Sequence, residues 1–149
     1  KYDHEFEGRN SRLDGLQAAI LDVKLRHLDS WINQRRILAN YYTEQLKGVP
    51  GLIRPSEAEG VFHVWHLFVI QTDKRDGLKD QLAKKGVQTG VHYPIALPVL
   101  KAYEYLGQAN FTNFSNDVCN NILSLPIGDH LCVTDVDLVV EAIISFFKE

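Results

Sequence analysis

The sequence predicts an α+β domain in which a small, mainly antiparallel sheet packs with long helices on one side. Residues 11–48 carry apolar side chains at helical spacing over an unusual length. Residues 52–149 alternate strand-like and helical patterns instead. A chain of 149 residues with 45% hydrophobic content is also large enough for one ordinary domain with its own core.

The segment 11–48 is predicted to be a long helical run with a kink or restart at Asp29-Ser30, because one helix of about 35 residues would far exceed the usual ~11–12. Residues 11–14 (Ser-Arg-Leu-Asp) have the form of a capping box at its start. The glycines and proline of residues 48–51 end it. The apolar stripe of its first half comprises Leu13, Leu16, Ile20, Val23 and His27, widened by Leu21, Leu25 and Leu28. The second half repeats the spacing at Trp31, Ile32, Arg35, Leu38, Tyr42 and Leu46.

The remainder, residues 52–149, is predicted to form the sheet-and-helix portion. Strands are expected at 52–54, 61–72 and 87–93, where β-branched and aromatic residues gather. A helix is expected over 73–85, with Leu78, Leu82 and Ala83 inward and Gly86 closing it.

Three further helices are expected after the third strand. The first covers 97–106 and ends at Gly107, and the second covers 114–123. The last begins with a second capping box at residues 134–137 (Thr-Asp-Val-Asp). Its buried stripe is predicted to be Val136, Val139, Val140, Ile143 and Phe147.

Charge and composition exclude several classes of function. The net charge is −3 and no long basic run occurs, which argues against a general nucleic-acid-binding protein. No apolar stretch reaches the ~20 residues that a membrane-spanning helix needs. Cys119 and Cys132 match neither a metal-binding nor a disulfide pattern, so we expect reduced thiols in a cytoplasmic protein.

Asn10 precedes the predicted start of the first helix and is a candidate anion-binding residue. The first N–H groups of a helix lack intrahelical partners and lie at the positive end of its dipole. Gly8 permits a tight turn, and Arg9 and Arg12 add positive charge, so a phosphate or carboxylate would fit there. An ordinary capped surface helix explains the same residues, and the spacing alone favours that simpler interpretation.

Three histidines, His63, His66 and His92, are considered as ligand contacts, and their positions in the sequence favour different roles. His63 and His66 lie three apart on a predicted strand, so they point to opposite faces and are not expected to bind one metal. His92 and Tyr93 lie where a strand ends before Pro94, a common place for ligand contacts. By spacing alone, a structural role for this pair remains the favoured alternative.

Several motifs, in order, resemble those of the DegT/DnrJ/StrS family of sugar aminotransferases. They cover essentially the whole chain, at residues 8–21 (GRNSRLDGLQAAIL), 24–25 (KL), 64–70 (VWHLFVI), 74–76 (KRD), 90–95 (GVHYPI), 102–103 (AY) and 123–127 (LSLPI). The resemblance implies a pyridoxal-phosphate enzyme of the aspartate-aminotransferase fold, type I. Residues 1–149 would be its C-terminal small domain, with the N-terminal domain that carries the Schiff-base lysine absent.

The same resemblance implies a reaction and partners. Family members move an amino group from glutamate, through pyridoxamine phosphate, onto a nucleotide-linked keto-sugar, and they work as homodimers. No lysine of this sequence lies in an obvious apolar pocket of the kind that Schiff-base chemistry uses. We therefore expect the chain by itself to be inactive and to bind no pyridoxal phosphate.

The resemblance also assigns expected roles to single residues. Asn10 would reach the cofactor phosphate of the partner subunit, with Arg12 and Tyr2 near the same pocket. His92 and Tyr93 would lie on the side of the nucleotide-sugar. Pro98 stands in a run where relatives often have a histidine, so no role for that histidine is carried over.

Two other functions remain open. The chain could be a non-catalytic dimerisation or regulatory module, or a nucleotide-sugar-binding domain that uses Asn10 and His92. A domain separated from its larger partner should expose apolar surface at the former interface. We therefore predict self-association through the helix spanning Leu16–Leu28.

Overall fold

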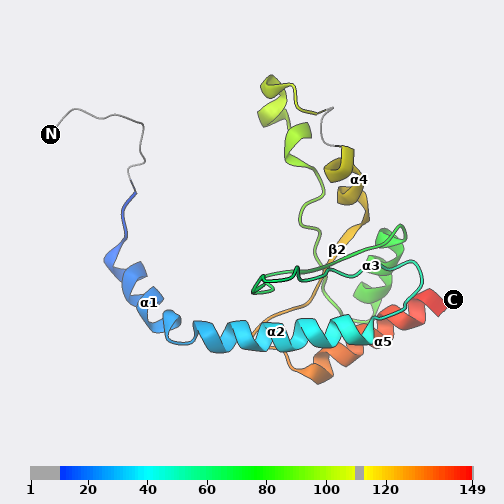
Figure 1. Ribbon diagram of the computed structural model, residues 1–149, viewed down its shortest axis with the longest axis horizontal. Helices are drawn as coiled ribbons and strands as arrows, with labels where there is room; N and C mark the ends of the chain where they lie inside the picture. Colours follow the sequence, from blue (N-terminus) through cyan, green and yellow to red (C-terminus); the bar gives the residue numbers. More distant parts are fainter. Residues whose placement is uncertain (1–10, 110–112, 149) are drawn as a thin grey trace. The chain divides into compact units, whose positions relative to one another are not determined.

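The computed structural model describes residues 11–109 and 113–148 (Figure 1). These divide into two units after Ser30, so that residues 11–30 belong to the first and the other described residues to the second. Each unit is described separately. The α-helices are α1 (Gly15–Leu25), α2 (Leu28–Gln45), α3 (Arg75–Lys84), α4 (Asn113–Asn121) and α5 (Val133–Lys148). The strands are β1 (Phe68–Gln71) and β2 (Ile122–Leu125), and the 3-10 helices are η1 (Leu97–Val99) and η2 (Lys101–Leu106). This composition confirms the α+β class and the small antiparallel sheet.

In the first unit, α1 is capped by Asp14. Its carboxylate accepts hydrogen bonds from the backbone N–H of Leu16 (2.9 Å) and Gln17 (3.2 Å). The predicted capping box with Ser11 as N-cap is therefore wrong, because the acid expected at its third helical position itself satisfies the first N–H groups. The break in the helical run also comes earlier than Asp29-Ser30. It lies between α1 and α2, where the Ser30 hydroxyl donates to the carbonyl of His27 at 2.7 Å.

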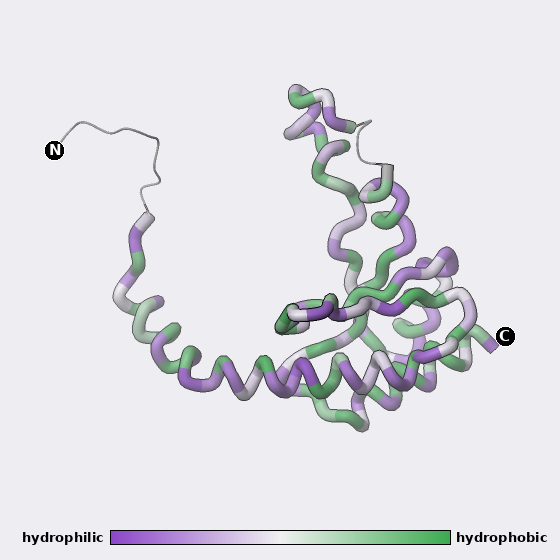
Figure 2. Tube along the Cα trace, in the orientation of Figure 1, coloured by the Kyte–Doolittle hydropathy of each residue, from purple (hydrophilic) through white to green (hydrophobic). Residues whose placement is uncertain are grey.

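The apolar stripe of α1 is present but not buried. No residue of α1 is buried, although apolar positions recur along it (Figure 2). Leu16 is 73% exposed and Ile20 is 51% exposed. The pattern thus predicted the helix correctly, whereas the other described residues of the first unit do not bury its apolar face.

The second unit is built on a small antiparallel sheet. β1 pairs with β2 in the register Phe68↔Leu125 to Gln71↔Ile122. Isolated antiparallel bridges extend the sheet on both sides, from Ile53 to Gln71 and from Gly90 to Ser124. The expected strands at 52–54 and 87–93 are therefore reduced to single bridges.

Two further sequence predictions, one of a strand and one of a helix, were wrong in their bounds. The predicted strand 61–72 is regular only over β1, because Trp65 adopts a positive φ of 50° and interrupts the extended chain. The predicted helix 114–123 ends at Asn121, and its last residues belong to β2. All four residues of β2 are buried, and a short continuous apolar run does not distinguish a buried strand from a helix.

The core lies between this sheet and helices α2, α3 and α5. Tyr42 of α2 stacks on Phe68 of β1 with ring centroids 4.9 Å apart. Leu78 and Leu82 of α3 are fully buried as predicted, whereas Ala83 is exposed. The predicted stripe of α5 is confirmed, with Phe147 only partly buried. The fully buried core side chains include Leu38, Tyr42, Leu46, Phe68, Ile70, Leu78, Leu82, Leu123, Val136 and Ile143.

The start of α5 differs from the predicted capping box by two residues. Cys132, not Thr134, precedes the first helical residue, and its N–H donates to the Asp135 carboxylate at 2.8 Å. The Cys132 thiol contacts the same carboxylate at 3.0 Å. These hydrogen bonds hold the pKa of Asp135 below its ordinary value, the thiol contact being the larger cause. The expected helix 97–106 is also different, since it consists of two 3-10 helices, although Gly107 ends it in the left-handed conformation as predicted.

Two consecutive arginines of α2 hold the irregular chain against the core. The Arg35 guanidinium donates to the carbonyls of Trp65 (3.4 Å), His66 (3.2 Å) and Ile127 (3.1 Å). Two loops that are far apart in the sequence are thereby attached to one side chain. Arg35 also lies 4.0 Å from the carboxylate of Asp129.

Arg36 forms a second cluster with Glu57. Both guanidinium Nη atoms donate to the carboxylate, at 2.8 and 3.3 Å. The backbone N–H of His63 donates to the same carboxylate at 2.7 Å, while the His63 carbonyl accepts from Arg36 at 2.6 Å. Hydrogen bonds from Arg36 and from the His63 backbone lower the pKa of Glu57 below its ordinary value of 4.5.

Replacing Glu57 with Gln should therefore remove an acid-sensitive contribution to stability. Because the folded-state pKa is lowered, this contribution is present above about pH 4.5 and is lost as the pH falls through the lowered pKa. Urea unfolding at several pH values should show a smaller free energy of unfolding for the variant at neutral pH and a weaker decline in acid. Glu59→Gln, at an exposed neighbouring acid, is the control. Equal pH profiles for wild type and Glu57→Gln would contradict the assignment.

Candidate functional site

His92 and Tyr93 lie just beyond the edge of the sheet. Gly90 is joined to Ser124 of β2 by two backbone hydrogen bonds of 2.7 and 3.1 Å, and the chain leaves the sheet after this pair. The His92 imidazole folds back over Gly90. A Cβ at position 90 would lie only 2.5 Å from the His92 Cε1 atom, so the ring occupies space that only glycine leaves free.

One nitrogen of the His92 ring is tied to the sheet. Nδ1 lies 2.9 Å from the hydroxyl oxygen of Ser124, a residue that is only 4% exposed. The residue His92 is itself exposed. The imidazole is thus fixed at one nitrogen by a buried hydroxyl.

Tyr93 stands beside His92 and is largely exposed. Its ring meets the imidazole edge-on, with centroids 5.5 Å apart and an interplanar angle of 87°. Tyr93 is 71% exposed. It also lines a cavity of about 800 Å³ whose walls are mostly apolar, formed by Tyr93, Pro94, Ile95, Ala96, Leu97, Pro98, Leu100, Gln108, Ser115 and Cys119. A mostly apolar cavity with a few polar groups at its edge is typical of small-molecule sites.

The described residues include three of the predicted site residues, and their roles stay predictions. Tyr93 lines the cavity, whereas His92, its neighbour in the chain, is not among the lining residues. Asn10 and Tyr2 lie outside the described residues, and Arg12 is an exposed residue ahead of α1. The sequence analysis missed Ser124, whose contact with His92 joins residues 32 positions apart.

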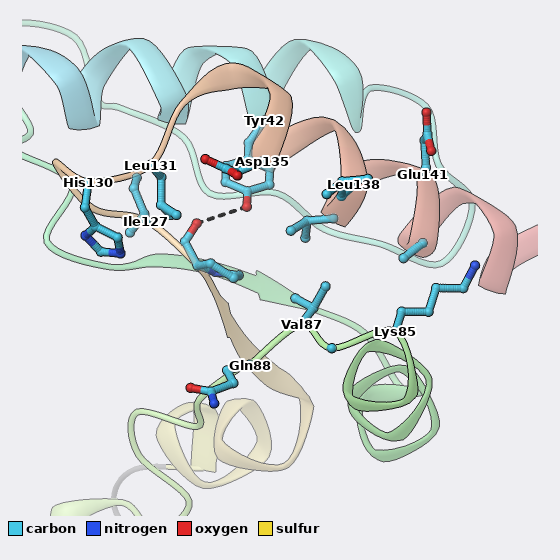
Figure 3. A pocket seen from close by; sticks show the side chains of 14 residues that line it. Tyr42, Lys85, Val87, Gln88, Ile127, His130, Leu131, Asp135, Leu138 and Glu141 are labelled. Carbon is cyan, nitrogen blue, oxygen red and sulfur yellow. Dashed lines mark hydrogen bonds between the residues drawn. The ribbon is translucent and has the colours of Figure 1, made fainter.

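A second cavity of about 620 Å³ lies between α2, residues 85–88, the turn at 126–131 and α5 (Figure 3). Its polar groups serve mainly the fold. The Tyr42 hydroxyl donates to the Pro126 carbonyl at 2.9 Å, and burial raises the pKa of this phenol. Asp135 accepts from Cys132. Lys85 and Glu141 lie at one end of the cavity and His130 at the other (Figure 3).

His63 and His66 do not lie on a regular strand as predicted, because β1 begins only at Phe68. His63 accepts a hydrogen bond at Nδ1 from the Trp65 N–H (2.8 Å), and its ring lies 4.2 Å from that of Trp65. Across residues 11–109 and 113–148, no group of three or more His, Cys, Asp or Glu side chains could hold a metal ion. None of the helices in the same ranges is both long and apolar enough to cross a membrane.

Comparison with known proteins gives a consistent result. The erythromycin biosynthesis sensory transduction protein EryC1 of Saccharopolyspora erythraea is 44% identical over 94% of this chain and 38% of its own length. The dTDP-3-amino-3,4,6-trideoxy-alpha-D-glucose transaminase of Streptomyces venezuelae is 41% identical over 96% of this chain and 38% of its own length. The chain thus spans less than half the length of these relatives.

The fold agrees with the sequence comparison. A crystal structure of S. venezuelae DesV in complex with a ketimine intermediate superposes with a TM-score of 0.89 and 38% identity, covering 100% of this chain and 40% of that one. The model of the DegT/DnrJ/EryC1/StrS aminotransferase family matches residues 1–144. The chain therefore belongs to the DegT/DnrJ/EryC1/StrS aminotransferase family.

Proposed function

We propose that this chain forms the C-terminal small domain of a cytoplasmic, pyridoxal-phosphate-dependent sugar aminotransferase of the type I fold. The complete enzyme transfers an amino group, from glutamate through pyridoxamine phosphate, to a nucleotide-linked keto-sugar. The observation that carries the proposal is the family match over residues 1–144, together with relatives that are named as transaminases of dTDP-sugars. In this proposal His92 and Tyr93 contact the sugar substrate, beside the cavity that Tyr93 lines.

The described residues do not by themselves fit a pyridoxal-phosphate site. Every lysine within residues 11–109 and 113–148 is exposed, whereas a Schiff-base lysine works in a desolvated setting. We therefore assign the Schiff-base lysine to the part of the enzyme that corresponds to the remaining length of the relatives. Asn10, with Arg12 and Tyr2 nearby, would contribute to the phosphate site of a partner subunit.

A second candidate function is a non-catalytic dimerisation or regulatory module. It draws support from one relative, which is named as a sensory transduction protein, and from the uncovered apolar residues of α1. Amino transfer by a longer protein that contains this chain distinguishes the two, because a regulatory module would show none.

The cofactor assignment predicts different results for two proteins. A longer protein that joins this chain to the remaining length of its relatives should give a borohydride-fixed pyridoxal-phosphate adduct, detected by mass spectrometry, on a lysine outside residues 1–149. It should also aminate a nucleotide-linked keto-sugar with glutamate as donor. The 149-residue chain should give no adduct. An adduct on a lysine of this chain would contradict the assignment, and no adduct on the longer protein would eliminate the transaminase function.

Removing the His92 side chain should weaken the binding of the sugar substrate. In the complete enzyme, His92→Ala should raise KM for the nucleotide-sugar about tenfold, since one ordinary hydrogen bond to a ligand is worth about 1.5 kcal/mol. Steady-state kinetics at varied nucleotide-sugar concentration measures this. His130→Ala, which removes another exposed histidine whose ring also packs on a glycine, is the matched control and should leave KM unchanged. Equal KM values for both variants would remove His92 from the proposed site.

Association should depend on the apolar face of α1. Ile20→Glu is expected to raise the dissociation constant of a homodimer by at least about 100-fold, because burial of an isoleucine is worth about 1.5–3 kcal/mol in each copy. Sedimentation equilibrium of the 149-residue chain tests this, with Gln17→Glu as a control that adds the same charge at a polar position of the same helix. A chain that remains monomeric at high concentration would contradict the proposal.

A further inference from the structure

The contacts of the His92 ring determine which of its nitrogens carries the proton. Nδ1 faces the buried Ser124 hydroxyl at 2.9 Å. Ser124 is 4% exposed, and within the described residues its hydroxyl has no other hydrogen-bond partner. A buried donor without an acceptor costs about 1–3 kcal/mol, whereas an unused lone pair of a hydroxyl costs far less. The hydroxyl proton is therefore directed to Nδ1, and Nδ1 is the acceptor.

This direction of the hydrogen bond fixes the rest of the ring. In a neutral imidazole one nitrogen donates and the other accepts, so a ring that accepts at Nδ1 carries its proton on Nε2. Gly90 also supports this position of the His92 ring, which packs against it. Because a Cβ there would lie 2.5 Å from Cε1, only glycine lets the ring lie low enough to reach Ser124. The backbone pairing of Gly90 with Ser124 keeps both residues in register with the ring.

We propose that Ser124 and Gly90 are positioning residues that hold His92 as the Nε2–H tautomer, so that it offers a neutral N–H donor to an acceptor oxygen of the ligand. The ligand group is a hydroxyl, keto or phosphate oxygen of the sugar nucleotide. This identification of the ligand rests on the proposed function. The tautomer itself depends only on contacts within this chain.

His130 is an internal comparison for the role of the hydroxyl. Its ring also folds over a glycine, since a Cβ at Gly128 would lie 2.5 Å from the His130 Cε1 atom. Among the described residues, however, no hydroxyl or other hydrogen-bond partner contacts the His130 ring. The two histidines thus share the packing on glycine, whereas only His92 faces a serine hydroxyl and His130 interacts electrostatically with Asp135.

The test is the tautomer ratio of His92 in the isotope-labelled 149-residue chain, read from long-range proton–nitrogen correlation spectra at alkaline pH, where imidazoles are neutral. His92→Gln identifies the signal. In the wild type, the Nε2–H form of His92 should exceed the Nδ1–H form by at least roughly tenfold, the factor that an ordinary hydrogen bond supplies. Ser124→Ala should lower that ratio by about the same factor, while the His130 signal stays unchanged.

Gly90→Ala is the second variant, and it covers the case in which Ser124→Ala does not fold. Position 90 does not have a positive φ, so alanine is compatible with the backbone, and the added methyl should displace the ring and remove the bias with Ser124 intact. Gly15→Ala, where an added Cβ meets no atom within 4 Å, and Ser145→Ala on α5 are matched controls. A wild-type ratio that favours Nδ1–H, or a ratio that survives both Ser124→Ala and Gly90→Ala, would overturn the proposal.

Kinetics of the complete enzyme test the part of the proposal that concerns the ligand. Ser124→Ala should raise KM for the nucleotide-sugar up to about tenfold with kcat little changed, and should add nothing further in a His92→Ala background. A purely structural serine would give additive effects, which would contradict the positioning role. If the enzyme shows no amino transfer at all while the tautomer shift is observed, the proposed function fails and the positioning of His92 stands.

Discussion

The arrangement of the second unit depends on the Arg35 guanidinium. This side chain of α2 donates to backbone carbonyls on both sides of the sheet segment, at residues 65–66 before β1 and at residue 127 after β2. Those carbonyls belong to irregular chain, which cannot satisfy them through a sheet ladder, and the contacts at Trp65 and Ile127 are partly buried, where a backbone group without a partner is costly. All three hydrogen bonds come from one Nη atom, whose two N–H groups the three carbonyls share, and the positive charge strengthens them. One residue therefore joins the segment before β1 to the segment after β2, next to the end of the sheet where Phe68 pairs with Leu125.

The candidate site is a consequence of where this sheet stops. β2 pairs along its whole length with β1 on one side, but on the other side it pairs only with Gly90. The segment after Gly90 therefore leaves the sheet after a single bridge. Of the two residues that follow, the His92 imidazole contacts Ser124 of the sheet, whereas the Tyr93 side chain is largely exposed. A rigid element thereby fixes one side chain of the pair, while the adjoining irregular segment supplies the apolar cavity. This division is common in ligand sites, where loops bring the contacts and a regular scaffold sets their direction.

Much of the fold could be predicted from the sequence, and the failures have physical causes. The stripes of α2 and α5 were predicted well because long periodic patterns are unambiguous. β2 was missed because Ile122–Leu125 is a short apolar run directly after a helical pattern, and only its pairing with β1 makes it a strand. The helix starts were misplaced because several acids and hydroxyls compete for the same N–H groups: Asp14 accepts those that begin α1, and the Asp135 carboxylate accepts the N–H of Cys132 ahead of α5. The strand that was expected to end at His92 and Tyr93 is only a single bridge at Gly90, and the contact of His92 with Ser124 could not be predicted, since it depends on the tertiary fold.

The uncovered helix α1 has a consequence for how this part of the chain acquires its order. An isolated helix shorter than about 12–15 residues is only marginally stable in water, and most helices in proteins depend on packing of their apolar face. α1 has 11 residues and none of them is buried. Its cap at Asp14 contributes locally but cannot replace that packing. Folding of this helix and association with whatever covers it should therefore be one coupled process, in which part of the interaction free energy is spent on ordering the chain. The affinity measured at that surface would then be lower than its apolar area suggests, and the helix content of the chain would rise with its concentration.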